Sequence, residues 1–178
     1  MIPKDCKRLA EVDFPKRTMI LYFAYGSNLN CCQLRSRCPS CQFVCRAVLK
    51  DHVLAFTRFS TGRQCGVADV VAKPGHDVWG VVYQIDERDL RELDRIEGFR
   101  PDRGPEENSY NRREVSVLRE GDINRALTVA TYVATKQNDW TPPSQTYLGK
   151  IIEEARFWGF PHEYREGLEQ FRQRISRR

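Results

Sequence analysis

Two short stretches of this 178-residue chain contain residues that could take part in chemistry. In the first, an apolar run ends abruptly in Gly26, Ser27 and Asn28, residue types that expose backbone N–H groups and begin helices. Successive N–H groups in such a turn can bind an anion. A plain strand-to-helix turn with Ser27 or Asn28 as the N-cap explains the pattern equally well, so both interpretations stay open.

The second stretch is the end of a predicted helix, where Glu97 comes just before Gly98. A carboxylate there faces the negative end of the helix dipole, which raises its pKa, and burial would raise the pKa further. A carboxyl group tuned in this way can accept and return a proton near neutral pH. An exposed glutamate at a helix end is the simpler interpretation, and the pattern alone favours it.

Five of the seven cysteines fall between residues 31 and 45 and raise the question of metal or redox chemistry. Cys38 and Cys41 form a C-x-x-C pair, but a second pair at matched spacing is missing, and no histidine lies at a suitable distance along the chain. An odd number of cysteines cannot pair completely within one chain. We therefore expect free thiols and no metal site.

The composition narrows the class of protein. With 40% hydrophobic and 30% charged residues, the chain is typical of soluble globular proteins. No apolar run approaches the roughly 20 residues that cross a bilayer, and residues 1–17 lack the apolar core of a secretory signal, so we expect a cytoplasmic protein without a membrane partner. The net charge of +5 is concentrated near the C-terminus, without a basic stripe between aromatic residues, so we expect no nucleic-acid partner.

Periodicity predicts the elements that position these residues. A strand over 19–25 is followed by a short helix that stops before Pro39. A helix capped by Asp86 carries its apolar face to Gly98 and precedes a polar loop over 100–109. The remaining segments are strands over 42–49, 53–59, 66–72, 78–85, 110–119 and 126–135, a turn over 72–77, and helices over 145–157 and 161–175.

This order of elements predicts an α+β fold in a single domain. Consecutive strands joined by short turns favour a mainly antiparallel or mixed small β-barrel, flanked by helices. The predicted domain spans 19–165, after a polar lead-in over 1–18 and before a basic helix end over 166–178.

The stretch YFAYGSNL, from Tyr22 to Leu29, resembles the signature of the γ-glutamylcyclotransferase-like superfamily. Three further stretches follow in the order of that family, namely VWGVVYQI with LRELDRIEGF, SYNRREVSV, and TPPSQTYLGKIIEEARFWGFPHEY. The resemblance therefore covers roughly residues 19–164. Eight contiguous residues together with a correctly placed Glu-Gly pair make it specific.

The resemblance implies a small-molecule γ-glutamyl substrate and a set of site residues. It places the catalytic acid/base on Glu97 and two substrate-contacting tyrosines on Tyr110 and Tyr147. It also implies that the backbone of one loop binds the γ-glutamyl group, through Tyr22, Phe23, Ala24, Tyr25, Gly26, Ser27, Asn28 and Leu29. No metal or organic cofactor is implied.

The implied reaction closes the γ-glutamyl group on itself, because its α-amine attacks its own γ-carbonyl and releases 5-oxoproline. The leaving group would be an amino acid or an amine. SYNRREVSV resembles the branches that act on γ-glutamylamines or antibiotic intermediates, whereas LYFAYGSNL, DVWGVVYQI and LDRIEGF resemble the amino-acid branch more. A non-catalytic binding module with the same fold is the remaining alternative.

Overall fold

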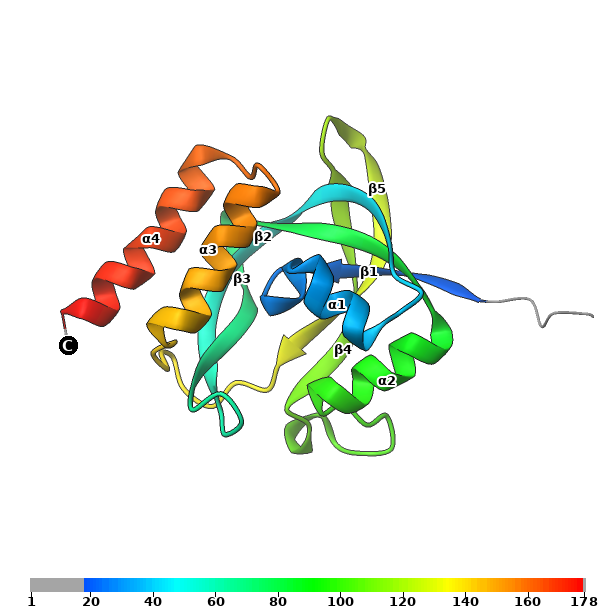
Figure 1. Cartoon of the computed structure of the whole chain (residues 1–178), viewed down its shortest axis with the longest axis horizontal. Coiled ribbons are helices and arrows are strands. Elements are labelled where there is room, and N and C mark those ends of the chain that lie inside the picture. Colours follow the sequence, from blue (N-terminus) through cyan, green and yellow to red (C-terminus); the bar gives the residue numbers. More distant parts are fainter. Residues whose placement is uncertain (1–17, 178) are drawn as a thin grey trace, which may run out of the picture.

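Five strands close into a barrel in the order β1-β3-β2-β4-β5 (Figure 1). They are β1 (Met19–Ala24), β2 (Gln42–Ser60), β3 (Cys65–Asp86), β4 (Tyr110–Arg119) and β5 (Asp122–Ala134). Neighbouring strands are antiparallel except β1 and β5, which pair in parallel at Tyr22 and Ala130. The computed structural model describes residues 18–177. The predicted α+β class and mixed barrel are confirmed, and residues 1–17 of the predicted lead-in lie outside the described residues.

The two longest strands absorb segments that the sequence separates. Strand β2 contains both predicted strands over 42–49 and 53–59, and β3 contains those over 66–72 and 78–85. The predicted turn over 72–77 is wrong, because β3 continues through it and residues 73–76 lie opposite Asp51. Asp51 has a φ of 56°, and its carboxylate accepts a hydrogen bond from the Gly75 N–H at 2.9 Å. The Pro-Gly signal therefore marks a bulge in a paired strand.

Four helices lie outside the barrel wall, α1 (Cys31–Arg37), α2 (Glu87–Glu97), α3 (Gln145–Phe157) and α4 (His162–Ser176), with short 3-10 turns η1 (Ser27–Leu29) and η2 (Pro105–Glu107). Helix α2 begins after Asp86 and ends at Gly98 as predicted, because Asp86 accepts from the Arg88 N–H and Gly98 has a φ of 70°. The alternative in which Ser27 or Asn28 caps the first helix is wrong. Asn30 caps α1 by accepting from the Gln33 N–H at 2.8 Å.

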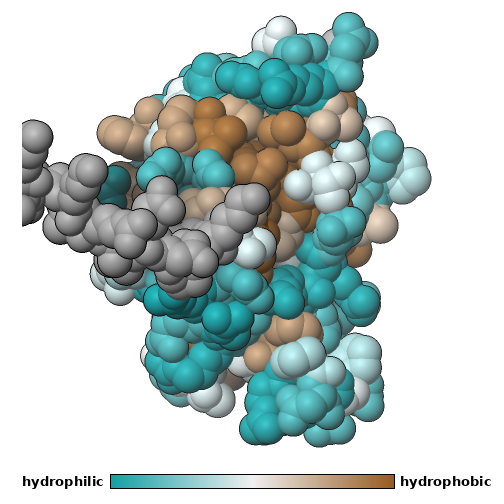
Figure 2. Space-filling model, turned by 90° about the vertical axis from the view of Figure 1, so that its right-hand side faces the viewer, coloured by the Kyte–Doolittle hydropathy of each residue, from teal (hydrophilic) through white to brown (hydrophobic). Residues whose placement is uncertain are grey.

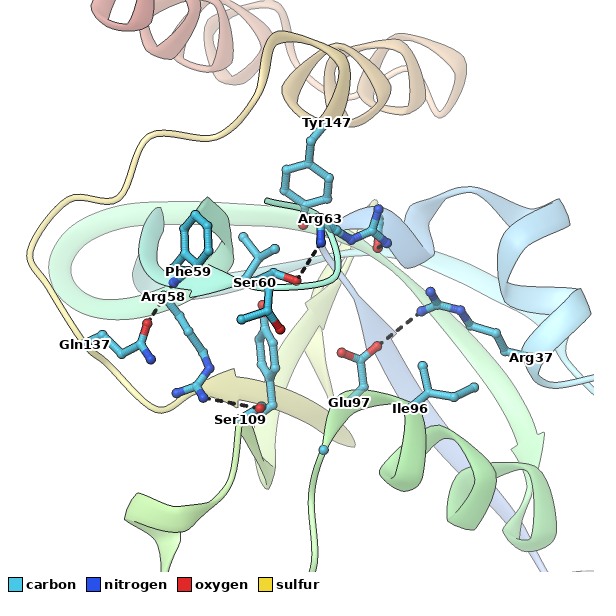
Figure 3. Close-up of a pocket in the computed structure, with 15 residues that line it drawn as sticks. Arg37, Arg58, Phe59, Ser60, Arg63, Ile96, Glu97, Ser109, Gln137 and Tyr147 are labelled. Atoms are coloured by element: carbon cyan, nitrogen blue, oxygen red, sulfur yellow. Dashed lines mark hydrogen bonds and ion pairs between the residues drawn. The ribbon is translucent and has the colours of Figure 1, made fainter. Parts of the chain in front are cut away.

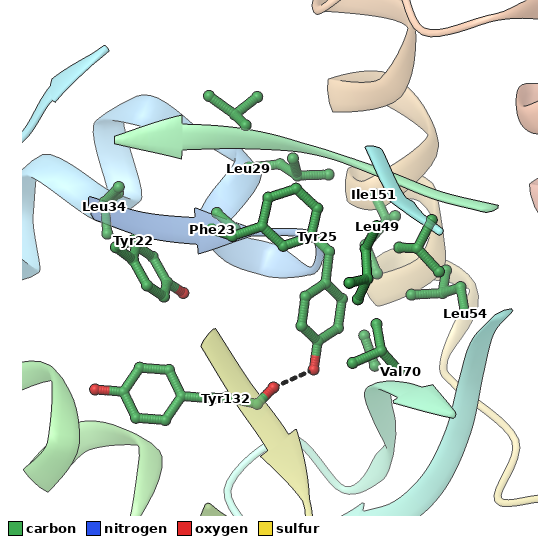
Figure 4. Close-up of a cluster of buried hydrophobic side chains, with 14 of the residues drawn as sticks. Tyr22, Phe23, Tyr25, Leu29, Leu34, Leu49, Leu54, Val70, Tyr132 and Ile151 are labelled. Atoms are coloured by element: carbon green, nitrogen blue, oxygen red, sulfur yellow. Dashed lines mark hydrogen bonds between the residues drawn. The ribbon is translucent and has the colours of Figure 1, made fainter. Parts of the chain in front are cut away.

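The core fills the barrel and continues beneath α3. Phe23 is fully buried, and Leu29 and Ile151 are each 1% exposed, so strand β1, turn η1 and helix α3 share one apolar cluster (Figure 4). Burial of a side chain of this size stabilises the fold by roughly 1.5–3 kcal/mol. Cys38 and Cys41 are also buried and pack as small apolar residues.

Helix α4 adds to this core from beyond the predicted domain boundary at residue 165. Leu168 is 1% exposed, and the Phe171 ring stacks on Trp140 with centroids 5.7 Å apart. The boundary itself stays a prediction.

Figure 1 shows α3 and α4 together on one side of the barrel. The opposite face of the molecule carries an apolar area bordered by hydrophilic residues (Figure 2). None of the described helices has the length and apolar character needed to span a bilayer.

Candidate active site

Two connected hollows open where α2, η1 and the β2–β3 turn meet. The outer hollow has a volume of about 340 Å³, and the inner one of about 40 Å³. Both are lined by Ser27, Glu97, Tyr110 and Tyr147, so these four residues stand where the hollows join. The structure thus brings the two stretches singled out in the sequence to one place.

Glu97 is held at this junction by the end of its helix. It is the last residue of α2, and the left-handed Gly98 turns the chain away, with Ser109 packed so closely that a Cβ on Gly98 would lie 3.0 Å from the Ser109 Cβ. The Glu97 side chain is 18% exposed and points into the outer hollow (Figure 3). A carboxylate is therefore presented to a ligand while most of its surface is shielded from water.

Asn28 connects Glu97 to the rest of the site. Its amide nitrogen donates to the Tyr22 hydroxyl at 2.9 Å and to Glu97 Oε1 at 3.2 Å. Its amide oxygen accepts from Arg37 at 2.8 Å and from Gln33 at 3.2 Å, which fixes the orientation of the amide. Asn28 is 5% exposed and uses its full hydrogen-bonding capacity within the protein. It holds one oxygen of Glu97 in a defined position.

The environment of Glu97 raises its pKa. Burial is the main cause, because it disfavours the ionised form. The Arg37 guanidinium at 3.4 Å, the hydrogen bond from Asn28 and the charge of Arg63 each oppose this effect and lower the pKa. Among the described residues only Oε1 has protein partners, so Oε2 is available to exchange a proton.

Tyr110 and Tyr147 come from β4 and α3 and meet at one residue of β3. The Tyr110 hydroxyl donates to the Ala68 carbonyl at 2.7 Å, and the Ala68 N–H donates to the Tyr147 hydroxyl at 3.2 Å. Burial raises the pKa of Tyr147 to about 12, so it stays protonated at neutral pH. Both phenols are thus fixed, neutral hydrogen-bonding groups in the wall of the site.

The loop expected to bind substrate divides into a lining part and a core part. The inner hollow is lined by Tyr22, Tyr25, Gly26, Ser27 and Asn28. In contrast, Phe23, Ala24 and Leu29 are buried in the apolar cluster and line neither hollow. Because residues alternate along a strand, the side chains of β1 cannot all face the same hollow. These three residues support the loop from beneath.

Gly26 is required for close packing. A Cβ at this position would lie 3.2 Å from the Ala68 Cβ and 3.8 Å from the Tyr147 hydroxyl. A side chain here would require Ala68 to move by a few tenths of an ångström.

Three arginines of the outer hollow were missed from the sequence. Arg37 comes from α1, Arg58 from β2 and Arg63 from the β2–β3 turn. Arg58 and Arg63 lie near the tip of one hairpin, and only the folded chain brings Arg37 of α1 to the same hollow. The one available signal is the pair of arginines in FTRFSTGR, one near the end of the predicted strand over 53–59 and one just before the predicted strand over 66–72.

A second buried carboxylate, Asp94, lies one turn before Glu97 on α2. Its oxygens accept from the Tyr132 hydroxyl at 2.7 Å and from Arg112 at 2.6 Å. Burial raises the pKa of Asp94, and these two partners oppose the rise.

Within residues 18–177 no group of three His, Cys, Asp or Glu side chains is arranged to hold a metal ion.

Known proteins resemble this chain in sequence and in structure. The model of the AIG2-like family matches residues 77–168. A human protein named gamma-glutamylcyclotransferase is 35% identical over 174 residues, covering 94% of this chain and 85% of its own length. Its mouse counterpart is 36% identical over 153 residues, covering 83% of this chain and 76% of its own. A solved structure named gamma-glutamyl cyclotransferase superposes with a TM-score of 0.75 at 33% identity, over 85% of this chain and 87% of its own.

Proposed function

The chain belongs to the gamma-glutamylcyclotransferase family, and from that premise we propose that it releases 5-oxoproline from a γ-glutamyl amino acid or amide, with Glu97 as the general acid/base. The observation that carries the role of Glu97 is its place at the junction of the two hollows, shielded from water and with Oε2 open. The raised pKa makes this carboxylate a stronger base than an exposed glutamate.

The proposed reaction is intramolecular. Glu97 takes a proton from the α-ammonium of the substrate, and the amine attacks the γ-carbonyl to form a new C–N bond in a five-membered ring. The bond from the γ-carbon to the leaving nitrogen then breaks, and Glu97 returns its proton to that nitrogen. The ring nitrogen gives up its second proton through Glu97 to the released amine, which leaves in its protonated form. The products are 5-oxoproline and a free amine or amino acid, so atoms and charge balance without a further reactant.

The rest of the site would bind and fold the substrate. We assign the γ-glutamyl group to the segment from Tyr22 to Leu29, where the backbone N–H groups of Gly26 to Asn28 face the α-carboxylate or the developing oxyanion. Tyr110 and Tyr147 would contact the same group from the opposite wall. Of the segment, Phe23, Ala24 and Leu29 would contribute by packing alone.

Release of 5-oxoproline, followed by mass spectrometry, tests this function. We expect release from at least one member of a panel of γ-glutamyl amino acids, γ-glutamylamines and glutathione. Glu97→Gln should reduce the rate of release by about 10²- to 10⁴-fold. Glu92→Gln is the matched control, because Glu92 lies on the exposed face of the same helix and, within the described part of the chain, forms its ion pair with Arg95. Release that survives in Glu97→Gln would remove this residue from the mechanism.

The alternatives give different results in the same assay. A γ-glutamylamine or antibiotic-intermediate cyclotransferase would release 5-oxoproline from amines and not from amino acids. A binding module of the same fold would bind γ-glutamyl compounds in calorimetry without releasing 5-oxoproline. Glu97 favours the enzyme over the module, because a raised pKa in a carboxyl group with an open oxygen suits proton exchange, which simple binding does not require.

We further propose that the protein works in the cytoplasm. Cys38, Cys41 and the other cysteines within residues 18–177 are free thiols, which suits a reducing compartment. A fluorescent fusion and cell fractionation would test this location, and enrichment in a secreted or membrane fraction would contradict it.

A further inference from the structure

The outer hollow carries more positive charge than the proposed proton transfer requires. Of the residues that line it, Arg37, Arg58 and Arg63 are cationic, and Glu97 is the one acid. Arg37 is engaged by Glu97 and Asn28. Arg58 and Arg63 form no ion pair with any Asp or Glu of the described residues. Two cations therefore border the hollow without an ion-pair partner among residues 18–177, although the charge of Arg63 acts on Glu97 at longer range.

Uncharged groups contact the guanidinium groups of both Arg58 and Arg63. Arg58 donates to the Thr135 carbonyl at 3.0 Å and to the Ser109 hydroxyl at 3.3 Å. The Arg63 guanidinium lies 5.0 Å from the centre of the Tyr147 ring and 3.4 Å from the Ser27 hydroxyl. Figure 3 shows Arg58 on the opposite side of Glu97 from Arg37, with Arg63 between them along the rim.

The inner hollow has a different character. Its lining consists of phenols, small residues, Asn28 and Glu97, and it contains no lysine or arginine. Glu97 lines both hollows, so a substrate that reacts there can extend into each of them. If the γ-glutamyl group lies against the segment from Tyr22 to Leu29, as the proposed function requires, its leaving group extends into the outer hollow.

We propose that Arg58 and Arg63 form an anion subsite that selects γ-glutamyl substrates whose leaving amine carries a carboxylate. This inference rests on the proposed function and specifies its substrate class. Guanidinium groups match a carboxylate in charge and in hydrogen-bond geometry. An amino acid or a short peptide fits this subsite, and an uncharged alkylamine leaves both arginines without a partner.

A pair of substrates that differ in one group tests the subsite. In γ-glutamylalanine the leaving amine carries a carboxylate, and in γ-glutamylalaninamide a neutral amide of the same size takes its place. We expect the wild-type kcat/KM for 5-oxoproline release to be about ten- to a hundredfold higher for γ-glutamylalanine. This preference should weaken as salt is added, because the subsite is partly exposed.

Arg63→Gln is the informative variant, because Arg63 lies in a turn and makes few contacts. It should lose most of the preference by lowering kcat/KM more for γ-glutamylalanine than for γ-glutamylalaninamide, and Arg63→Lys should keep part of it. Because Arg63 also lowers the pKa of Glu97, the two substrates are compared on the pH plateau of each variant. Arg125→Gln, an exposed change of the same charge in strand β5, controls for net charge and should behave as wild type. Arg58→Gln should act in the same direction as Arg63→Gln, with its melting temperature compared because its contacts to Thr135 and Ser109 are lost.

Three results would overturn the subsite. Equal losses on both substrates would mean that the arginines bind the α-carboxylate that both substrates share. A wild-type enzyme without preference between the substrates would mean that the arginines do not read the leaving group. Release from neither substrate nor any other γ-glutamyl compound would overturn the proposed function, and the subsite with it.

Discussion

Helix α2 carries two buried carboxylates that differ in what surrounds them. Asp94 and Glu97 are three residues apart, and burial raises the pKa of both. Asp94 has a strong partner on each oxygen, Tyr132 at 2.7 Å and Arg112 at 2.6 Å. Glu97 has longer contacts, at 3.2 and 3.4 Å, and both are on Oε1.

This difference separates a structural acid from a reactive one. The partners of Asp94 come from β4 and β5, so this carboxylate fastens α2 to the barrel. The partners of Glu97 come from η1 and α1 and leave one oxygen facing the hollow. Burial alone does not mark a catalytic group, and an open hydrogen-bonding position in a hollow does.

The largest effect should separate the two residues by activity. Glu97→Gln should lower kcat/KM by about 10²- to 10⁴-fold, because the proton acceptor is lost. Asp94→Asn should leave kcat/KM within a few-fold in protein that is folded, because Asp94 lines neither hollow. Steady-state kinetics at a temperature well below both unfolding transitions measures this. An equal loss in both variants would remove the distinction.

Stability should show the reverse order. Asp94→Asn should lower the free energy of unfolding by about 1–3 kcal/mol, because Arg112 loses its charged partner and Tyr132 a strong acceptor. Urea unfolding followed by circular dichroism measures the change. Glu92→Gln, which breaks an exposed pair with Arg95, should cost less than about 1 kcal/mol. A cost for Asp94→Asn no larger than that of the control would contradict the fastening role.

The pH profile should respond to Arg37, which lowers the pKa of Glu97. In Arg37→Gln this pKa rises, so the acid limb of kcat/KM, which reports ionisation of the base in the free enzyme, should move to higher pH. Arg112→Gln, which removes the partner of Asp94, should leave the limb in place. A limb that moves to lower pH in Arg37→Gln would show that another group sets it.

The smallest effect concerns stability and pH at Glu97. A carboxyl group whose pKa is raised by folding binds more protons in the folded state, so stability falls as pH rises from the ordinary glutamate pKa to the raised one. Wild type should therefore lose stability relative to Glu97→Gln between about pH 4 and about pH 7. Urea unfolding of both proteins at the two pH values checks this. A difference that is constant with pH would mean that Glu97 has the same pKa in both states.

Local sequence signals predicted the position of Glu97 at the end of α2, but they did not predict the partners of Asp94. The bounds of α2 follow from Asp86 and Gly98, whose roles depend on neighbouring residues only. The position of Glu97 at a helix end could be predicted for the same reason. The partners of Asp94 could not, because Arg112 and Tyr132 reach it only when the barrel closes.

Errors in the predicted strands have the same origin. The Pro-Gly segment over 72–77 has the local signature of a turn, yet β3 continues through it because β2 offers paired residues on both sides. Arg37 of α1 joins the two arginines of the β2–β3 hairpin only in the folded chain, so local signals could not predict the group of three. The resemblance to a family supplied Tyr110 and Tyr147, which residue types alone do not single out.

The shared contact at Ala68 gives the two site tyrosines opposite polarity. The Tyr110 hydroxyl donates its only proton to the Ala68 carbonyl, so toward a ligand it can act only as a hydrogen-bond acceptor. The Tyr147 hydroxyl accepts a hydrogen bond from the Ala68 N–H, so its own proton can be donated to a ligand. An ammonium group therefore gains by lying beside Tyr110 and a carbonyl or carboxylate oxygen by lying beside Tyr147. One residue of β3 therefore sets a donor at one side of the pocket and an acceptor at the other, which favours one orientation of a γ-glutamyl group over the reverse.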